Sequence, residues 1–161
     1  EPLSVAVLGA EVEFDVDWDP RDPGDARDAV AAEITQTITR FREAPRAVLD
    51  AATHAVYTYY RDTRDMMVAD QDEYYLEEVP DIDDPAAVWD MVTFGQYPLV
   101  RQADGTWYVS LECGCAWEEE HGLQIVFRNG DTITKLGPFD DFLSWPEGLK
   151  DRSGDGVYCD Y

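Results

Sequence analysis

Lysine is scarce in this sequence, with Lys135 and Lys150 as the only two among 161 residues. The 12 Lys and Arg residues stand against 35 Asp and Glu residues, so the formal net charge is -23. Proteins that bind nucleic acid or anionic membranes rely on Lys and Arg side chains to neutralise phosphates. The shortage of basic residues excludes both classes, and we expect neither a nucleic-acid nor a membrane partner.

Long apolar runs are also lacking, so no segment is expected to span a membrane. No basic and then apolar leader opens the chain, and its first residue, Glu1, fits either a trimmed or a processed protein. We therefore expect a cytoplasmic protein. The 45% of hydrophobic residues, with 12% aromatic, is enough for one folded domain over residues 1–161.

Cysteine is too rare for a disulfide framework, because Cys113, Cys115 and Cys159 are the only three. The first two lie in LECGCAW, which alternates as a strand does. Their thiols would share one face, with the Cα atoms about 7 Å apart, too far for a disulfide bond. Free cysteine is often buried, so the pattern favours core thiols.

The first third of the chain predicts a hairpin and then helices. Residues 3–18 are expected to form two strands joined by a turn at Gly9, because apolar and acidic residues alternate there. The apolar residues on the inner side are Val12, Phe14, Val16 and Trp18, and the acidic residues on the outer side are Glu11, Glu13, Asp15 and Asp17. A loop is expected over residues 19–25. Apolar residues at helical spacing then continue to Phe41, which predicts a helix. Pro45 either opens a second helix or kinks one long helix. The second stretch at helical spacing ends with Met66 and Met67.

Residues 69–84 are acidic and without periodicity, which indicates a connection, and Asp84 with Pro85 opens a short helix. The rest of the chain predicts strands, with tight turns at Asp104-Gly105 and Asn129-Gly130. Counted from the second turn, the expected pairs are Arg128 with Asp131, Phe127 with Thr132, Val126 with Ile133 and Ile125 with Thr134. The fold class is therefore α+β: a mostly antiparallel sheet, made of the N-terminal hairpin and a C-terminal meander, with two main helices on one face and one short helix.

Metal-binding residue types gather between the two predicted turns. The candidate ligands are Cys113, Cys115, Glu118, Glu120 and His121, but the one-residue gap between the thiols is not a typical zinc spacing. A solvated turn beside buried thiols explains the same pattern, so we expect no metal and no cofactor. No nucleophile elbow or phosphate-binding loop occurs, which favours a non-enzymatic protein. A cation-binding or hydrolytic protein is the alternative.

The stretch CGCAWEEEHGLQIVFRNGD resembles the C-terminal part of an uncharacterised prokaryotic family, known as a domain of unknown function. The shared pattern is Cys-x-Trp-x-x-Glu-His-Gly-Leu, here Cys115, Trp117, Glu120, His121, Gly122 and Leu123. The resemblance implies no established activity, and links the chain loosely to toxin-immunity systems. It implies a structural role for the pattern: Trp117 anchors the turn, Glu120 and His121 fix it, and Gly122 allows its backbone conformation.

The function that these features favour is a small acidic binding protein, such as one of the immunity type, that recognises a basic protein partner. The expected contact residues are Glu11, Glu13, Asp15 and Asp17 on the hairpin and Tyr74 and Tyr75 in the acidic connection. An alternative is a housekeeping domain of a salt-adapted organism, whose acidic surface serves solubility. The sequence gives no indication of the oligomeric state.

Overall fold

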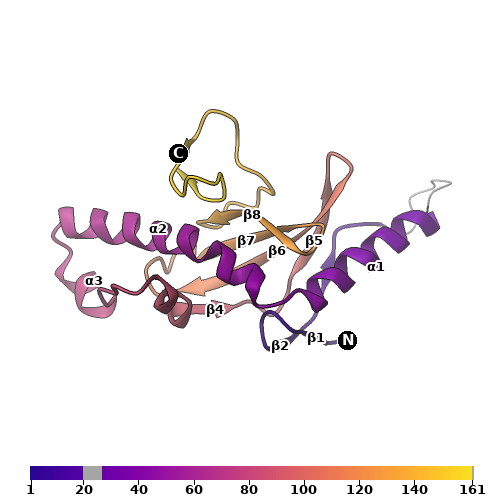
Figure 1. Ribbon diagram of the computed structural model, residues 1–161, viewed down its shortest axis with the longest axis horizontal. Coiled ribbons are helices and arrows are strands. Elements are labelled where there is room, and N and C mark those ends of the chain that lie inside the picture. The colour runs from indigo at the N-terminus through magenta and orange to yellow at the C-terminus, as the bar shows by residue number, and fades with distance from the viewer. Residues whose placement is uncertain (20–26, 161) are drawn as a thin grey trace.

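The computed structural model describes residues 1–19 and 27–160, and it has an α+β fold around a six-stranded sheet (Figure 1). The strand order is β3-β5-β6-β7-β8, and β4 pairs with β6 beside β5. All pairs in this sheet are antiparallel except β3 with β5. Its strands are β3 (Asp15–Val16), β4 (Val92–Phe94), β5 (Leu99–Ala103), β6 (Thr106–Cys115), β7 (Leu123–Arg128) and β8 (Thr132–Gly137). The predicted fold class is confirmed.

The meander from β5 to β8 follows the predicted turns. Asp104 and Gly105 both have positive φ, 49° and 75°, as a two-residue hairpin turn requires. In β6 the alternate residues Trp107, Val109, Leu111, Cys113 and Cys115 are all buried. The predicted inward direction of both thiols is therefore confirmed.

Two helices cover one face of the sheet, α1 (Arg27–Glu43) and α2 (Ala47–Ala69) (Figure 1). Pro45 lies between them, so the chain forms two helices and not one kinked helix. The aromatic rings of Phe41 in α1 and Phe127 in β7 meet edge to face, with centroids 4.9 Å apart. The stripe on α2 ends earlier than predicted, because Met66 is 53% exposed.

The N-terminal hairpin is shorter than predicted. β1 (Leu3–Val5) pairs with β2 (Ala10–Val12) around the turn that contains Gly9. The chain then leaves this pair, and β3 joins the main sheet in parallel with β5. The predicted alternation still holds, since Val12 is buried and Glu11, Glu13, Asp15 and Asp17 are exposed. The predicted loop at residues 19–25 lies, apart from Asp19, outside the described residues.

The predicted register of the last hairpin is wrong. Arg128 pairs with Thr132 and Phe127 with Ile133, one residue further along than expected, and a bulge after Val126 adds a second shift. The two shifts together restore the alternation of faces, because side chains alternate with a period of two. The turn packs on α1: a Cβ atom on Gly130 would lie 2.2 Å from the Thr37 carbonyl oxygen.

The acidic connection contains a helix that the sequence analysis missed, α3 (Glu73–Glu78), opened by the side chain of Asp72, which accepts the Tyr75 N–H at 3.0 Å. The expected short helix is present as the 3-10 helix η1 (Pro85–Met91). It is capped by Asp84, which accepts the Ala86 N–H. None of the helices in the described part of the chain is both long and apolar enough to cross a bilayer.

The C-terminal segment, residues 138–160, covers the sheet face opposite the helices and then wraps round β8. It contains the short strands β9 (Lys150–Asp151) and β10 (Cys159–Asp160). At the β8 edge the Leu136 N–H donates to the Val157 carbonyl oxygen, and the rings of Tyr158 and Tyr59 of α2 lie 5.3 Å apart. The segment therefore links the outer sheet edge to α2.

Candidate functional site

The turn between β6 and β7 is organised by Glu118. Its carboxylate accepts the backbone N–H groups of Glu120 at 2.9 Å and of His121 at 3.1 Å. It also contacts the imidazole Nδ1 atom of His121 at 2.9 Å. Gly122 completes the turn with a φ of 63°, and a Cβ atom there would lie 2.4 Å from the Cys113 carbonyl oxygen. The residue that fixes this turn, together with His121, is Glu118 and not Glu120.

Aromatic residues of α2 and α3 hold the same turn in place. The hydroxyl of Tyr75 donates to the Trp117 carbonyl oxygen at 2.9 Å, and that of Tyr59 to the Gly122 carbonyl oxygen at 3.2 Å. The Trp117 indole is fully buried and meets the rings of Tyr59 and Tyr60 edge to face. Trp117 therefore anchors the turn to α2.

The five candidate metal ligands do not form one cluster, although the side chains of Glu118 and His121 are in contact. Burial raises the pKa of the Cys113 and Cys115 thiols to about 12, so both stay protonated at neutral pH, whereas metal ligation needs the thiolate. Glu118 is engaged with the turn, and Glu120 and His121 are exposed on its outer side. Residues 1–19 and 27–160 contain no group of three or more His, Cys, Asp or Glu side chains placed to hold a metal ion.

The two groups of predicted contact residues lie apart. Glu11 lies in β2 and Glu13 just after it, whereas Asp15 and Asp17 lie at β3 in the main sheet. Tyr74 and Tyr75 belong to α3, which lies at one end of the molecule, away from β1 and β2 (Figure 1). Asp17 is paired with Arg101 at 2.9 Å. Tyr74 is 77% exposed, whereas Tyr75 is half-buried. One continuous contact surface cannot include both groups.

Two hollows flank the C-terminal end of α2. The α3 hollow, about 240 Å³, lies between α3 and residues 116–119. The α2 hollow, about 620 Å³, lies between α2, Phe139 and the end of the C-terminal segment. Met67 and Glu118 line both. Met66 and Met67 continue the apolar stripe of α2 in the sequence and were predicted to be buried, so their contribution to this surface was not predicted.

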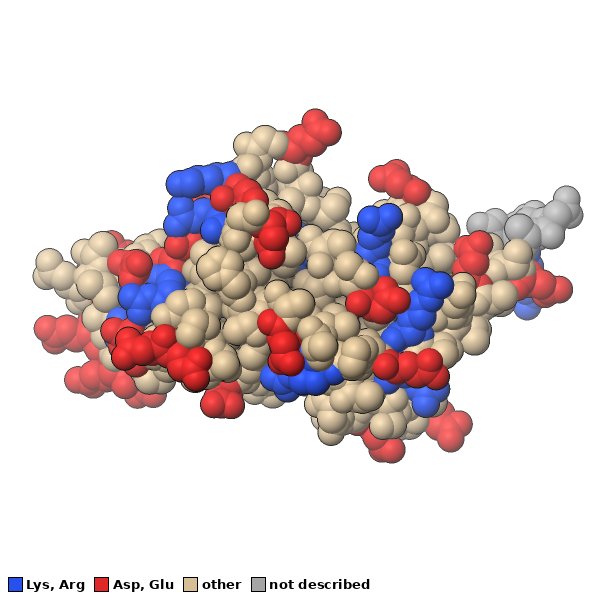
Figure 2. Space-filling model, viewed as in Figure 1, with Lys and Arg blue, Asp and Glu red and all other residues tan. Residues whose placement is uncertain are grey.

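The charged side chains that line these hollows are acidic, although Arg64 lies near Tyr75 and Arg152 near Tyr158. Residues 70–84 contain eight acidic residues and no basic one. On the face shown in Figure 2, Asp and Glu gather most densely at the end formed by α3 and the end of α2, although they also occur over the rest of that face. Neither hollow is lined by Lys or Arg. The α3 end thus combines hollows, aromatic side chains and negative charge.

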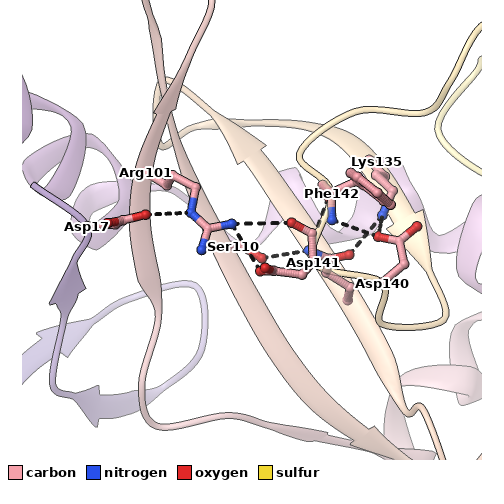
Figure 3. Close-up of polar contacts among 8 residues, drawn as sticks. Asp17, Arg101, Ser110, Lys135, Asp140, Asp141 and Phe142 are labelled. Atoms are coloured by element: carbon pink, nitrogen blue, oxygen red, sulfur yellow. Dashed lines mark hydrogen bonds and ion pairs between the residues drawn. The ribbon is translucent and has the colours of Figure 1, made fainter.

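A second polar cluster lies on the sheet face beneath the C-terminal segment (Figure 3). The ammonium of Lys135 is fully buried, donates to Gln124 Oε1 at 2.8 Å and Asp140 Oδ1 at 2.6 Å, and lies 4.5 Å from the centre of the Trp145 ring. Gln124 Nε2 in turn donates to Ser110 Oγ and to the Phe142 carbonyl oxygen. Burial lowers the pKa of Lys135, and Asp140 opposes that shift. The cluster holds the C-terminal segment on the sheet, and its Asp140 also lines the α2 hollow.

The chain belongs to a family described only as a domain of unknown function, DUF6985, which matches residues 1–143. No curated protein and no solved structure gives a match. The family match includes the whole six-stranded sheet, the three α-helices and the turn at Glu118.

Proposed function

We propose that this protein is a non-enzymatic binding protein that recognises a basic protein partner, in the manner of an immunity protein. The observation that carries the proposal is the acidity of the α3 end: eight of the residues from Asp70 to Asp84 are acidic and none is basic, and Tyr74 among them is exposed. One of the eight, Asp81, is paired with Arg61 and Arg64 of α2, and the others leave an excess of negative charge. Such an excess attracts an oppositely charged protein and speeds the encounter.

The α3 end is a better contact surface than the hairpin because it offers more than charge. Tyrosine and methionine are enriched at protein interfaces, where they supply apolar area beside polar groups. Tyr74 and Met66 are 77% and 53% exposed at this end. The hairpin acids Glu11, Glu13, Asp15 and Asp17 are the second contact surface that we consider.

A second candidate role for the charge is solubility in concentrated salt. It is favoured by the exposure of acidic residues at both ends of the molecule and by the presence of only two lysines. In molar salt the Debye length falls to about 3 Å, so an acidic coat no longer repels itself strongly. This role predicts that solubility depends on the acidic surface as a whole and not on the acidic residues of one particular patch.

The test compares two triple variants with the same change in net charge. The first is Glu73→Lys, Glu77→Lys and Glu78→Lys on α3. The second, called the hairpin variant, is Glu11→Lys, Glu13→Lys and Asp15→Lys, which run from β2 of the hairpin to the start of β3. Each tagged protein is used to capture partners from an extract of the native host at low salt and at about 1 M salt. We expect a basic protein to be retained at low salt by the wild type and the hairpin variant, and to be lost by the α3 variant by about tenfold or more.

Loss in the hairpin variant alone would move the contact surface to the hairpin. If no salt-sensitive basic protein is captured, and the free energy of unfolding instead rises in molar salt, the binding proposal is wrong and the acidic surface serves solubility. Circular dichroism of both variants checks that each is folded.

A further inference from the structure

We propose that the two hollows beside the end of α2 together receive one basic amphipathic helix of the partner protein. Its apolar side chains enter the hollows, and its Lys and Arg side chains meet the carboxylates around them. This inference rests on the proposed function and adds to it the form of the partner's contact segment.

Exposed hydrophobic side chains lie along the end of α2 and on α3, and two of them line the hollows: Met66 the α2 hollow and Tyr74 the α3 hollow. Of the five large hydrophobic side chains that are exposed in the described part of the chain, three lie between residues 66 and 74: Met66, Val68 and Tyr74. Met67 lies between the two hollows and lines both. Methionine is flexible and polarisable, and it recurs on surfaces that bind the apolar face of a helix. Apolar side chains gathered in this way mark an interaction surface.

The carboxylates that line the hollows favour a basic occupant. The α3 hollow is lined by four acidic residues and the α2 hollow by three, with Glu118 common to both. Asp72, Glu118 and Asp140 already accept hydrogen bonds from their own chain. Glu78, Glu119 and Asp160 are exposed at the rims, so they can meet Lys and Arg side chains of a partner.

The aromatic residues of α3 add a place for one cationic side chain. The Tyr75 hydroxyl is bound to the Trp117 carbonyl oxygen at 2.9 Å, which fixes the tyrosine ring at the wall of the α3 hollow. Tyr74 lines the same hollow and is 77% exposed. A Lys or Arg side chain near these rings gains a cation–π interaction in addition to its attraction to Glu78. Apolar hollows with a carboxylate rim match an amphipathic helix with one apolar and one basic face.

The test uses two synthetic peptides of about 18 residues, or five helical turns. Both contain the same numbers of Leu and Lys; one places Leu at helical spacing, and the other has a scrambled order. Binding to the full chain is measured by fluorescence anisotropy at about 0.15 M salt. We expect the amphipathic peptide to bind about tenfold more tightly than the scrambled one, since charge is equal and only the apolar face differs.

Two single variants locate the contact. Ala116→Lys adds a long cationic side chain at an exposed residue that lines the α3 hollow, and Ala32→Lys makes the same change at an exposed position of α1. We expect Ala116→Lys to weaken binding of the amphipathic peptide about tenfold and Ala32→Lys to change it by less than about twofold. Should Ala116→Lys fail to fold, Met67→Ser removes apolar contact from both hollows without a change in charge.

Equal binding of the two peptides, or equal effects of Ala116→Lys and Ala32→Lys, would overturn this inference. The proposed function could still stand in that case, because it depends on the capture of a basic protein and on its loss in the α3 charge variant.

Discussion

The two faces of the central sheet are both covered, but by different kinds of contact. The face beneath α1 and α2 buries apolar side chains such as Leu111, Ile125 and Phe127, all without exposure to solvent. The opposite face buries Gln124 and Lys135 beneath the C-terminal segment. The contacts on the first face are non-directional, whereas each polar group on the second needs a partner in the right place.

Substitutions on the two faces should therefore destabilise the protein for different reasons. Removal of a buried apolar side chain costs the free energy of its transfer from water, and the cavity that remains adds a further cost. Removal of one polar partner leaves another polar group buried without a hydrogen bond, a penalty larger than the net value of the bond itself.

The largest effect is expected on the apolar face. Phe127→Ala removes a fully buried ring that meets Phe41, and we expect the free energy of unfolding to fall by about 3–5 kcal/mol. Urea denaturation at neutral pH measures it. The matched control is Phe142→Ala, because the Phe142 ring on the other face is 61% exposed and its loss should change stability by about 0.5 kcal/mol at most. Similar losses for both would contradict the assignment of the faces.

A smaller effect is expected from the polar face. Asp140→Asn removes the carboxylate charge opposite the buried Lys135 ammonium, and we expect a loss of about 2 kcal/mol. Asp141→Asn is the control, because the Asp141 side chain is 55% exposed and its pair with Arg101 should contribute about 0–1 kcal/mol. Thermal or urea unfolding of both variants gives the comparison, and a greater loss for Asp141→Asn would show that the enclosed cluster is not the stronger attachment.

At alkaline pH, the stability should show a pH dependence with opposite sign for the two faces. On the apolar face, the pKa of Cys113 and of Cys115 is raised from 9.0 to about 12, so the folded state keeps protons that the unfolded state loses. Their contribution to stability is complete below pH 9.0 and is lost as the pH rises towards 12. On the polar face, the pKa of Lys135 is lowered from 10.5, so its deprotonation adds stability as the pH rises towards 10.5.

Urea unfolding at a series of alkaline pH values separates these contributions. Cys113→Ala with Cys115→Ala should flatten the fall in stability above pH 9.0, by up to about 1.4 kcal/mol per pH unit for each thiol. Lys135→Met should make the fall steeper below pH 10.5. A wild-type profile that is flat from pH 9.0 to 12, or Cys variants that match it, would refute the opposite signs.

Much of the architecture could be predicted from the sequence, because it depends on patterns among residues that are close together in the chain. Alternation in residues 106–115 identified β6 and the inward direction of both thiols. The Asp104-Gly105 turn needed only residue types that tolerate positive φ. The break at Pro45 needed only the missing backbone donor of proline. Each of these features depends on residues close together in the chain.

The candidate surface could be predicted only in part. Tyr74, Tyr75 and their acidic surroundings were recognised from composition, but Met66 and Met67 were placed in the core because they continue a helical stripe. Helix α2 extends beyond the sheet that it covers, so the last residues of its apolar stripe are not covered by the sheet and lie beside α3. Whether an apolar residue at the end of a stripe is buried depends on what lies opposite it, and a periodic pattern does not contain that information.

The helices on either side of Pro45, the meander from β5 to β8, the buried thiols and the acidic surface all follow from the sequence alone, since alternation, turn residues and charge act through neighbours in the chain. Tertiary structure alone decided the register of β7 with β8, where the turn packs on α1 and a bulge follows Val126. It also decided the partners of Lys135 and the meeting of α3 with the Glu118 turn. These features join segments far apart in the chain, and their energies depend on distances that no local pattern records.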